Sequence, residues 1–238
     1  MKLKKTAICA AAMLLMTVTA GCGSQEPPFD ASGMTDHQFL ITLYPEYAPI
    51  TCENFESLVA DGFYDGIVFH RVMEGFMAQG GDPTGTGMGG SEKTIKGEFS
   101  SNGVQNDLSH TRGIVSMARS GDPNSASSQF FICYSDDDTF LDGNYAAFGK
   151  VTEGMQVVDN FLKVELDYSS SGELSVPTSP ITIDTAVMVG PDAEGHPQAL
   201  FTMKDFLPAD GGETPSDSAE EAPADSQADE QETAPALQ

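Results

Sequence analysis

The sequence predicts a mainly β fold, a β-barrel or sandwich with two helices as caps. Three observations support this prediction. Many short runs are rich in β-branched and aromatic residues, glycine-rich segments separate them, and only two stretches have helical periodicity. The two helical stretches lie far apart in the chain, which does not fit the regular alternation of strands and helices in an α/β sheet.

The expected elements lie in one domain, residues 37–190. The first strand covers 38–44, where Phe39, Ile41 and Leu43 alternate with polar residues. A helix over 49–60 follows, with Thr51 as its N-cap, and a second helix is expected over 154–163. Shorter β-type runs complete the domain. They cover residues 67–72, 76–79, 113–118, 129–134, 145–151 and 181–189.

The N-terminal region predicts export. Residues 1–21 have a basic start and an apolar run too short for a permanent membrane span, which is typical of a signal peptide. Thr19-Ala20-Gly21-Cys22 resembles the bacterial lipobox, although Thr19 stands where leucine is usual, so Cys22 is the predicted lipidation site. The alternative is an ordinary signal that contains a cysteine by chance. Residues 22–36 form a tether, and the mature protein is expected to be extracytoplasmic, anchored to the bacterial cell membrane as a lipoprotein.

The C-terminal region differs from the domain in composition. Residues 191–203 are interpreted as a C-terminal extension. Residues 204–238 contain ten acidic residues and one basic residue, and they are rich in Ala, Pro and Ser. Such a segment has too few apolar side chains to offset the entropy cost of ordering, so it is predicted to be a disordered acidic tail.

The overall charge excludes several classes of function. The chain has 36 acidic residues against 11 Lys and Arg, a formal net charge of −25. Nucleic-acid binding needs clustered cations, so no nucleic-acid partner is expected. The four cysteines lack zinc-site spacing, and neither a metal nor a cofactor is predicted. Cys52 and Cys133 could pair outside the cell, but buried free thiols are preferred.

Three motifs invite a functional reading that their context does not support. Residues 85–90 fit the G-x-G-x-x-G pattern, but no helical periodicity follows, so a flexible surface loop is expected. Residues 136–138 are three aspartates without the spacing of a calcium loop, and they predict a solvated turn. His70 and His110 lack a second ligand at metal spacing and are expected to pack or to hydrogen-bond.

Four segments at suitable intervals resemble one family, the cyclophilin-type peptidyl-prolyl cis/trans isomerases. They are Phe69–Asp82, Gly113–Ala118, Ser128–Cys133, and Phe140–Gly143 with Phe148–Val151. The resemblance covers about residues 40–190. It implies an eight-stranded antiparallel closed β-barrel capped by two α-helices, with the substrate groove on the outer wall because side chains fill the interior. It also implies a monomeric enzyme acting on proline-containing unfolded or exported polypeptides.

The chemistry of this reaction points to Arg71. Amide resonance sets a barrier of roughly 18–20 kcal/mol to rotation of a peptide bond. Near the top of the barrier the prolyl nitrogen recovers its lone pair, so a fixed donor stabilises the transition state more than the planar ground state. Arg71 is always charged and carries several donors on a rigid plane, which makes it the predicted catalytic residue.

The resemblance also implies the other residues of the groove. Phe76, Met77, Phe131 and Leu141 would form the pocket for the proline ring. Polar anchors would be Gln79, Gln129 and the backbone of Arg119, with Ala118 at the floor. Phe140 and Tyr145 complete the predicted substrate-binding set. The alternative to catalysis is a cell-surface chaperone or binding module that holds Pro-containing peptides in the same groove.

The chain departs from the family pattern at several positions. Phe140 stands where many eukaryotic members have Trp, Tyr145 where His is usual, and Arg119 where Asn is frequent. Because Phe140 cannot donate a hydrogen bond, we expect weak binding of cyclosporin. Only one strand precedes the first helix, and residues 29–36 are turn-like, so we expect either an incompletely closed barrel or an irregular segment in place of the missing strand. The 172–180 loop is longer than expected.

Overall fold

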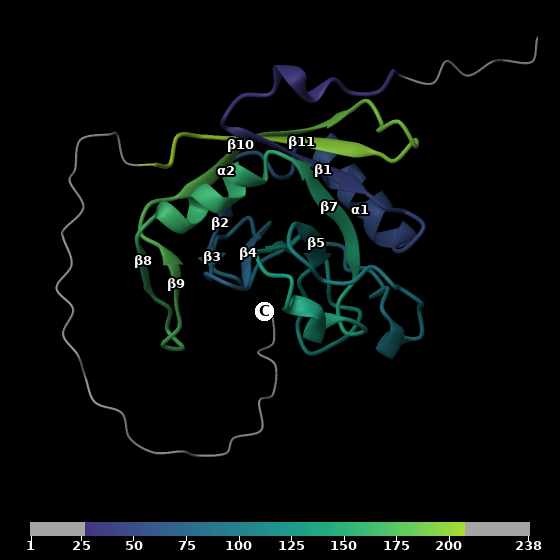
Figure 1. The fold of residues 1–238 in the computed structure, drawn as a ribbon. Coiled ribbons are helices and arrows are strands. Elements are labelled where there is room, and N and C mark those ends of the chain that lie inside the picture. The colour runs from purple at the N-terminus through teal and green to yellow at the C-terminus, as the bar shows by residue number, and fades with distance from the viewer. Residues whose placement is uncertain (1–26, 208–238) are drawn as a thin grey trace, which may run out of the picture.

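One antiparallel sheet contains the predicted strands and closes on itself (Figure 1). The computed structural model describes residues 27–207, so the predicted signal peptide, Cys22 and residues 208–238 lie outside the described residues. The strands of this sheet are β1 (Gln38–Leu43), β2 (Val68–Phe69), β3 (Arg71–Val72), β4 (Met77–Gly80), β5 (Ile114–Met117), β6 (Phe130–Cys133), β7 (Ala147–Glu153), β10 (Ile181–Val189) and β11 (Gln198–Met203).

The barrel closes through a single bent strand. The sheet order is β2-β10-β11-β1-β7-β5-β6-β4-β3, so its two outer members are β2 and β3. Only His70 separates them in the chain, and its amide donates to the carbonyl of Gln79 at 3.0 Å. When β2 and β3 are counted as one strand, nine members become eight. The predicted eight-stranded closed barrel is therefore confirmed.

The strand missing at the N-terminal edge is supplied by the C-terminal part of the chain. β11 lies between β10 and β1, and Gln38 is paired with Thr202 at one end of the β1–β11 ladder. Residues 29–36 are turn-like, as predicted, with a 3₁₀ turn over Ala31–Gly33. Both expectations for the edge were wrong, because a regular strand closes the barrel there. Residues 191–203 are thus not an extension outside the domain but a hairpin loop followed by a barrel strand.

The packed part of the chain also continues beyond residue 203. The amide of Lys204 donates to the carbonyl of Thr182, and the ring of Phe206 is buried against Phe161 at 5.3 Å between centroids. The predicted start of the tail at residue 204 was therefore wrong for 204–207. An apolar ring with a partner offsets the ordering cost that the composition of the segment suggested.

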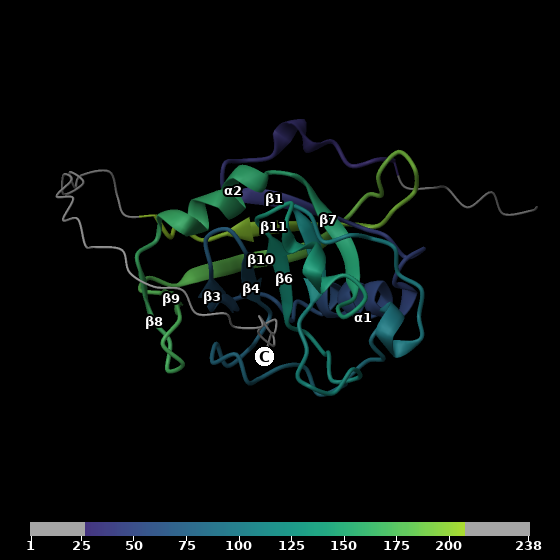
Figure 2. The same cartoon turned by 60° about the horizontal axis from the view of Figure 1, so that its bottom comes forward.

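Two helices cover separate parts of the barrel (Figure 2). α1 (Pro49–Ala60) has the predicted bounds, but Thr51 is not its N-cap. Instead, the buried carboxylate of Glu98 accepts hydrogen bonds from the amides of Ile50 and Thr51 and from the Thr51 hydroxyl, at 2.7–3.0 Å. A carboxylate at the N-terminus of a helix accepts hydrogen bonds from the unpaired amides there, and its negative charge interacts favourably with the positive end of the helix dipole. α2 (Met155–Asp159) continues into a 3₁₀ turn, Asn160–Lys163.

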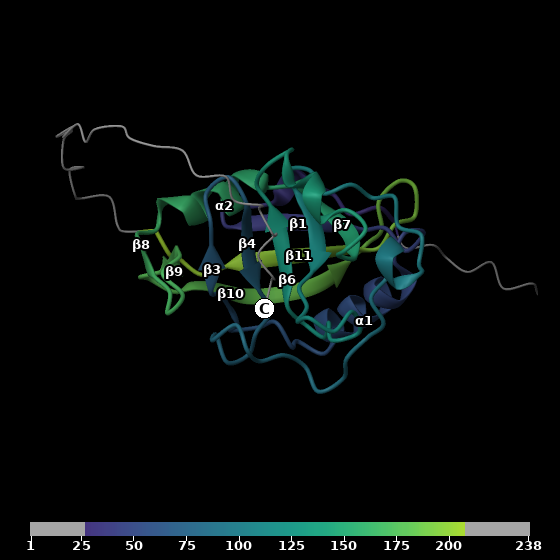
Figure 3. The same ribbon diagram turned by 90° about the horizontal axis from the view of Figure 1, so that it is seen from below.

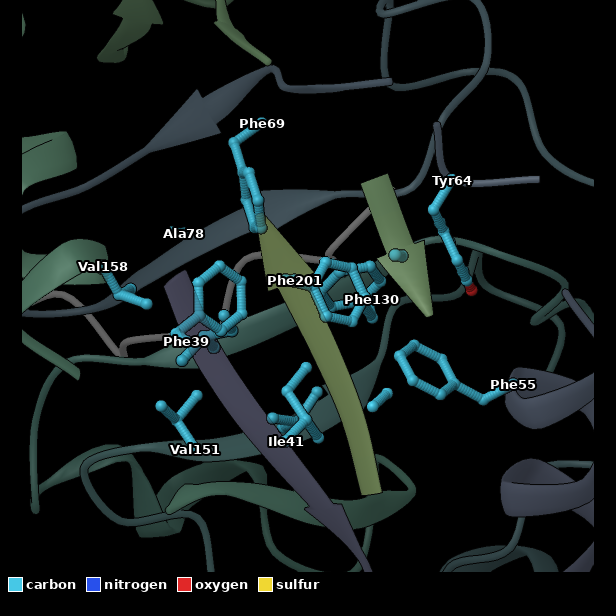
Figure 4. Close-up of a cluster of buried hydrophobic side chains, with 14 of the residues drawn as sticks. Phe39, Ile41, Phe55, Tyr64, Phe69, Ala78, Phe130, Val151, Val158 and Phe201 are labelled. Atoms are coloured by element: carbon cyan, nitrogen blue, oxygen red, sulfur yellow. The ribbon is translucent and has the colours of Figure 1, made fainter. Parts of the chain in front are cut away.

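The interior of the barrel is filled mainly by aromatic rings (Figure 4). Phe201 of β11 lies 5.2 Å from Phe39 of β1 and 6.0 Å from Phe130 of β6, measured between ring centroids. Phe55 extends from α1 into the same cluster, 5.0 Å from Phe148. These side chains leave no open channel, so any groove for a ligand has to lie on the outer wall.

A second, two-stranded sheet stands beside the barrel. β8 (Leu166–Tyr168) and β9 (Leu174–Pro177) form a hairpin, and β9 lies alongside β3 (Figure 3). Residues 172–180, which the sequence predicts to be an unusually long loop, are therefore partly a strand. The hairpin brings its turn next to the start of the predicted groove.

Candidate active site

Strand pairing brings the predicted polar residues to one outer face of the barrel. Arg71 of β3 is directly opposite Gln79 of β4, and Gln79 is directly opposite Phe131 of β6. Residues that are opposite each other in neighbouring strands point to the same face. The alternate residues of these strands, such as Ala78 and Phe130, belong to the barrel core. Because successive side chains of a strand point to opposite faces, residues of the predicted groove alternate with residues of the barrel core.

Arg71 is held by three different side chains. Its Nε and Nη2 donate to the two carboxylate oxygens of Glu173 at 2.7 and 2.8 Å, and Nη1 donates to Oε1 of Gln79 at 3.3 Å. Nη2 also lies 3.3 Å from the sulfur of Met73. The guanidinium is consequently fixed in orientation. Sequence reasoning missed Glu173, which lies 102 residues from Arg71.

Gln79 and Gln129 form a hydrogen-bonded chain along the groove. Nε2 of Gln79 donates to Oε1 of Gln129 at 2.9 Å. Nε2 of Gln129 donates in turn to the carbonyls of Gly87 and Gly89, at 3.0 and 2.7 Å. The two predicted polar anchors are therefore in contact, and the 85–90 loop helps to orient them.

The G-x-G-x-x-G segment is a surface loop organised around Asp82. The Asp82 carboxylate accepts hydrogen bonds from the amides of Thr84, Thr86, Gly87 and Gly89 at 2.7–3.1 Å. Burial alone would raise the pKa of Asp82, but these hydrogen bonds outweigh it and lower the pKa to about 2. A Cβ at Gly89 would collide with the Asp82 carboxylate, which explains the glycine there. No helix follows the loop, so it lacks the structure of a dinucleotide site.

The predicted proline-pocket residues belong to one apolar cluster, separate from the barrel core. Met77, Phe131 and Leu141 are each at most 1 % exposed, and Ala118 and Tyr145 pack with them. Phe76 lies partly exposed at the margin of this cluster. Phe140 is 50 % exposed and packs on Phe76 with 5.7 Å between ring centroids. The accessible apolar surface is thus provided by the two outer rings above a closed floor.

Two departures from the family pattern are in contact with each other. The guanidinium carbon of Arg119 lies 4.7 Å from the ring centroid of Tyr145 and 5.1 Å from that of Phe99. Its Nε donates to the carbonyl of Asn144. This cation–π arrangement holds the Arg119 side chain over Tyr145. A pocket beside it is lined by Ala118, Arg119 and Gln129 together with Met88 and Ser125.

Three polar side chains, of which His110 and Ser116 are buried and Asp142 is exposed, are hydrogen-bonded beside the apolar cluster. Nδ1 of His110 is 2.7 Å from the carboxylate of Asp142, and Nε2 is 2.9 Å from the hydroxyl of Ser116. Burial lowers the pKa of His110, although Asp142 opposes this effect. Ser116 is fully buried, so it cannot meet a substrate as a nucleophile. The His110 ring stacks on Phe131 at 6.0 Å, which assigns it a packing role, as expected for this histidine.

One of the three consecutive aspartates is not solvated. Asp138 is 2 % exposed, whereas Asp136 and Asp137 are exposed, so the predicted solvated turn was wrong for this residue. Burial raises the pKa of Asp138 to about 6, although hydrogen bonds from the Ser135 amide and the Cys133 thiol oppose the shift. Asp138 begins the 3₁₀ turn Asp138–Leu141, which carries Phe140 and Leu141.

Cys52 and Cys133 are buried free thiols, as preferred from the sequence. Burial raises the pKa of Cys52 to about 12 and also raises that of Cys133. Neither is a thiolate at neutral pH, so neither is a nucleophile. Within residues 27–207 no three His, Cys, Asp or Glu side chains gather as metal ligands. In the same range no helix has the length and apolar character that crossing a membrane requires.

The structure is an antiparallel barrel that places Arg71 and a separate apolar cluster on its outer wall. The family model described as cyclophilin type peptidyl-prolyl cis-trans isomerase/CLD matches residues 31–187. The chain therefore belongs to the cyclophilin-type peptidyl-prolyl cis-trans isomerase family, and it is an enzyme of that class.

Similar proteins agree with this assignment. The peptidyl-prolyl cis-trans isomerase ppi1 of Schizosaccharomyces pombe is 44 % identical over 151 residues, 63 % of this chain and 92 % of the relative. The peptidyl-prolyl cis-trans isomerase-like 1 protein of Rhizopus delemar is 48 % identical over 53 % of this chain and 75 % of its own length. A crystal structure of a Cryptosporidium parvum cyclophilin, determined in the presence of the dipeptide Ala-Pro, has a TM-score of 0.54 and 30 % identity, covering 70 % of this chain and 93 % of that one.

Proposed function

We propose that Arg71 lowers the barrier to X–Pro rotation by donating a hydrogen bond to the prolyl nitrogen in the twisted transition state. The observation that supports this mechanism is the fixed guanidinium, which lies on the same strand face as Gln79 and within 6.0 Å of the Phe76 ring centroid. A proline ring resting on Phe76 and Phe140 would bring its nitrogen toward Arg71. No proton is transferred, so an always-charged donor is sufficient.

Polar groups beside Arg71 would hold the rest of the peptide. Gln79 and Gln129 are 0 % and 8 % exposed and are hydrogen-bonded to each other, so they would support Arg71 from beneath, while the partly exposed Arg119 would offer its backbone to the peptide next to proline. Holding both flanks of the proline leaves rotation about one bond as the remaining freedom, which is how positioning lowers a barrier. The resulting substrate is an extended segment of an unfolded polypeptide.

The mechanism is tested with Arg71→Ala in a peptide isomerisation assay. We expect kcat/KM to fall by about 100-fold or more, the order of loss seen when a transition-state donor is removed. The matched control is Arg112→Ala, because Arg112 also makes a bidentate ion pair, with Asp159, but contacts none of the predicted groove residues. Wild-type protein that binds a Pro-containing peptide without accelerating its isomerisation would instead identify a non-catalytic binding module.

We also propose that this enzyme is a monomer that assists the folding of exported proteins while attached to the bacterial membrane through lipidated Cys22. The support is the sequence of residues 1–22, with its basic start, apolar run and lipobox-like end. Two acyl chains on one cysteine give durable attachment, whereas one chain gives marginal attachment. The relatives named above are eukaryotic proteins, so this role rests on the sequence of this chain.

The anchor has its own experiment. Cys22→Ala is expected to move the protein from the membrane fraction to the soluble fraction and to abolish incorporation of labelled palmitate. Cys133→Ala is the control, since that thiol is buried in the barrel wall. Membrane retention of the Cys22→Ala protein contradicts the proposal.

A further inference from the structure

Glu173 contacts Arg71 from outside the barrel. It lies in the turn of the β8–β9 hairpin, and its carboxylate meets Nε and Nη2 of Arg71 at 2.7 and 2.8 Å. Two parallel hydrogen bonds between a carboxylate and a guanidinium fix both the position and the plane of the guanidinium. None of the residues predicted from the sequence for this groove does so.

The turn that carries Glu173 is well ordered by its own hydrogen bonds. The amide of Ser169 donates to the carbonyl of Glu173 at 2.8 Å, and the amide of Gly172 donates to the carbonyl of Ser169 at 2.9 Å. Gly172 has a φ of +84°, which a residue with a side chain rarely adopts. The Glu173 amide donates to the Ser169 hydroxyl at 3.2 Å. The carboxylate is therefore held in place by the hairpin.

Arg71 has five N–H groups, and its contacts occupy some of them and leave another for a substrate. Glu173 accepts from Nε and from Nη2, Met73 contacts Nη2, and Gln79 accepts from Nη1. Within residues 27–207, Nη1 donates one hydrogen bond, to Gln79, and its second N–H has no acceptor. The Nε–Nη2 edge is thus occupied by Glu173, while the nitrogen that contacts the groove residue Gln79 retains a donor.

We propose that Glu173 is a positioning residue. It would orient Arg71 so that the guanidinium can donate a hydrogen bond to the prolyl nitrogen. This inference rests on the catalytic role of Arg71 proposed above. An arginine side chain has many rotamers, and a donor that must find its orientation in the transition state loses part of its effect. The hairpin supplies the missing constraint from a part of the chain that lies outside the barrel.

A purely structural role does not account for this ion pair. The side chains of Arg71 and Glu173 are 15 % and 27 % exposed, so the pair is mostly buried and loss of one partner also costs some stability, which has to be measured beside catalysis. The barrel strands pair with each other without the hairpin. Loss of Glu173 should consequently affect catalysis much more than stability.

The experiment compares Glu173→Gln and Glu173→Ala with wild type in kcat, KM and thermal unfolding. We expect kcat to fall about tenfold in Glu173→Gln and further in Glu173→Ala, with KM within twofold and Tm nearly unchanged, because orientation matters in the transition state and not in ground-state binding. Asp167→Asn is the matched control. It removes the same charge from the same hairpin, and Asp167 is exposed and does not contact Arg71.

A second measurement separates alignment from general damage. Sodium acetate should restore part of the kcat of Glu173→Ala, by supplying a carboxylate to Arg71, whereas sodium chloride at equal ionic strength should not. Arg71→Ala is measured in parallel. If Arg71→Ala is inactive while both Glu173 variants keep a kcat within twofold of wild type, the positioning role is wrong and the proposed mechanism stands. If Arg71→Ala is as active as wild type, the mechanism itself is wrong.

Discussion

The two faces of β4 and β6 differ in what fixes their side chains. On the inner face, Ala78, Phe130 and Ile132 pack with apolar side chains from nearly every barrel strand. On the outer face, Gln79 depends on named polar partners, among them Gln129, and Gln129 depends on the 85–90 loop. The inner face is held by close packing, which depends on volume and shape. The outer face combines a packed apolar cluster, to which Met77 and Phe131 belong, with polar side chains that are held by hydrogen bonds from particular groups in distant loops.

This difference predicts that stability and activity can be changed separately. Substitutions on the inner face should lower the free energy of unfolding and leave the folded fraction fully active. Substitutions of exposed residues on the outer face, such as Phe140, should change kinetics or ligand binding with little effect on folding. Three experiments test this separation, in order of decreasing expected effect.

The largest effect is expected for Phe201→Ala on the inner face of β11. Phe201 is fully buried against Phe39, Phe55 and Phe130, and removal of a buried phenylalanine costs about 3–5 kcal/mol of unfolding free energy. Urea unfolding measures this loss, and kcat per folded molecule should not change. Val187→Ala, at a 46 % exposed position of the neighbouring strand, is the control, with a loss below about 0.5 kcal/mol. A small loss at Phe201 would argue against β11 as an integral barrel strand.

The next effect depends on pH and concerns Asp138. Its folded-state pKa of about 6 lies above the ordinary value of 3.8, so the folded state binds the proton more tightly than the unfolded state. The resulting stabilisation is complete below pH of about 4 and is lost as the pH rises through about 6. The side chain of Asp138→Asn stays neutral at every pH. The free energy of unfolding of this variant, relative to that of wild type, should therefore rise by up to about 3 kcal/mol between pH 4 and pH 7.5.

The measurement for Asp138 is thermal or urea unfolding of both proteins across this pH range. Asp137→Asn is the control, because Asp137 is its exposed neighbour in the chain and should show no comparable dependence. A wild-type stability that does not decrease between pH 4 and 7, relative to Asp138→Asn, would contradict the prediction. The result also tests the boundary between the two faces, since Asp138 begins the turn that carries Phe140.

The smallest effect is expected for Phe140→Trp on the outer face. Phe140 is 50 % exposed, so an indole should fit without disturbing the core. The indole N–H adds a hydrogen-bond donor, worth about 1 kcal/mol, so cyclosporin affinity should rise by roughly five- to tenfold. Calorimetric titration measures the affinity, and Tm should stay within a degree or two. Nanomolar binding by the unsubstituted protein would show that Phe140 does not limit cyclosporin affinity.

Most of the barrel strands could be predicted from the sequence because β-type runs rich in apolar residues are separated by glycine-rich segments. The runs at 38–44, 113–118, 129–134 and 181–189 match β1, β5, β6 and β10 within one or two residues. β11 was missed because its residues were interpreted as an extension. Ala199, Phe201 and Met203 do alternate inward, and a Pro- and Gly-containing turn precedes them, so the signal of a hairpin was present.

The site residues that could be predicted are those that match the family motifs, and the residues outside those motifs could not be predicted. The position of Arg71 opposite Gln79 follows from two strands joined by a short turn. Contacts between residues in distant loops leave no such trace. The Arg71–Glu173 pair, the Glu98 cap of α1 and the Arg119–Tyr145 contact all join residues far apart in the sequence, where neither periodicity nor spacing carries information.

The pairing of β1 with β11 has a consequence for how the chain folds. Gln38 and Thr202, which are hydrogen-bonded, lie 164 positions apart in the chain. Contacts of such long sequence separation form slowly, because a long loop must be closed before they contribute. During synthesis the barrel cannot close until residue 203 is available, and until then β1 and β10 both present unpaired edges. A peptidyl-prolyl cis-trans isomerase thus has, in its own topology, a late step of folding.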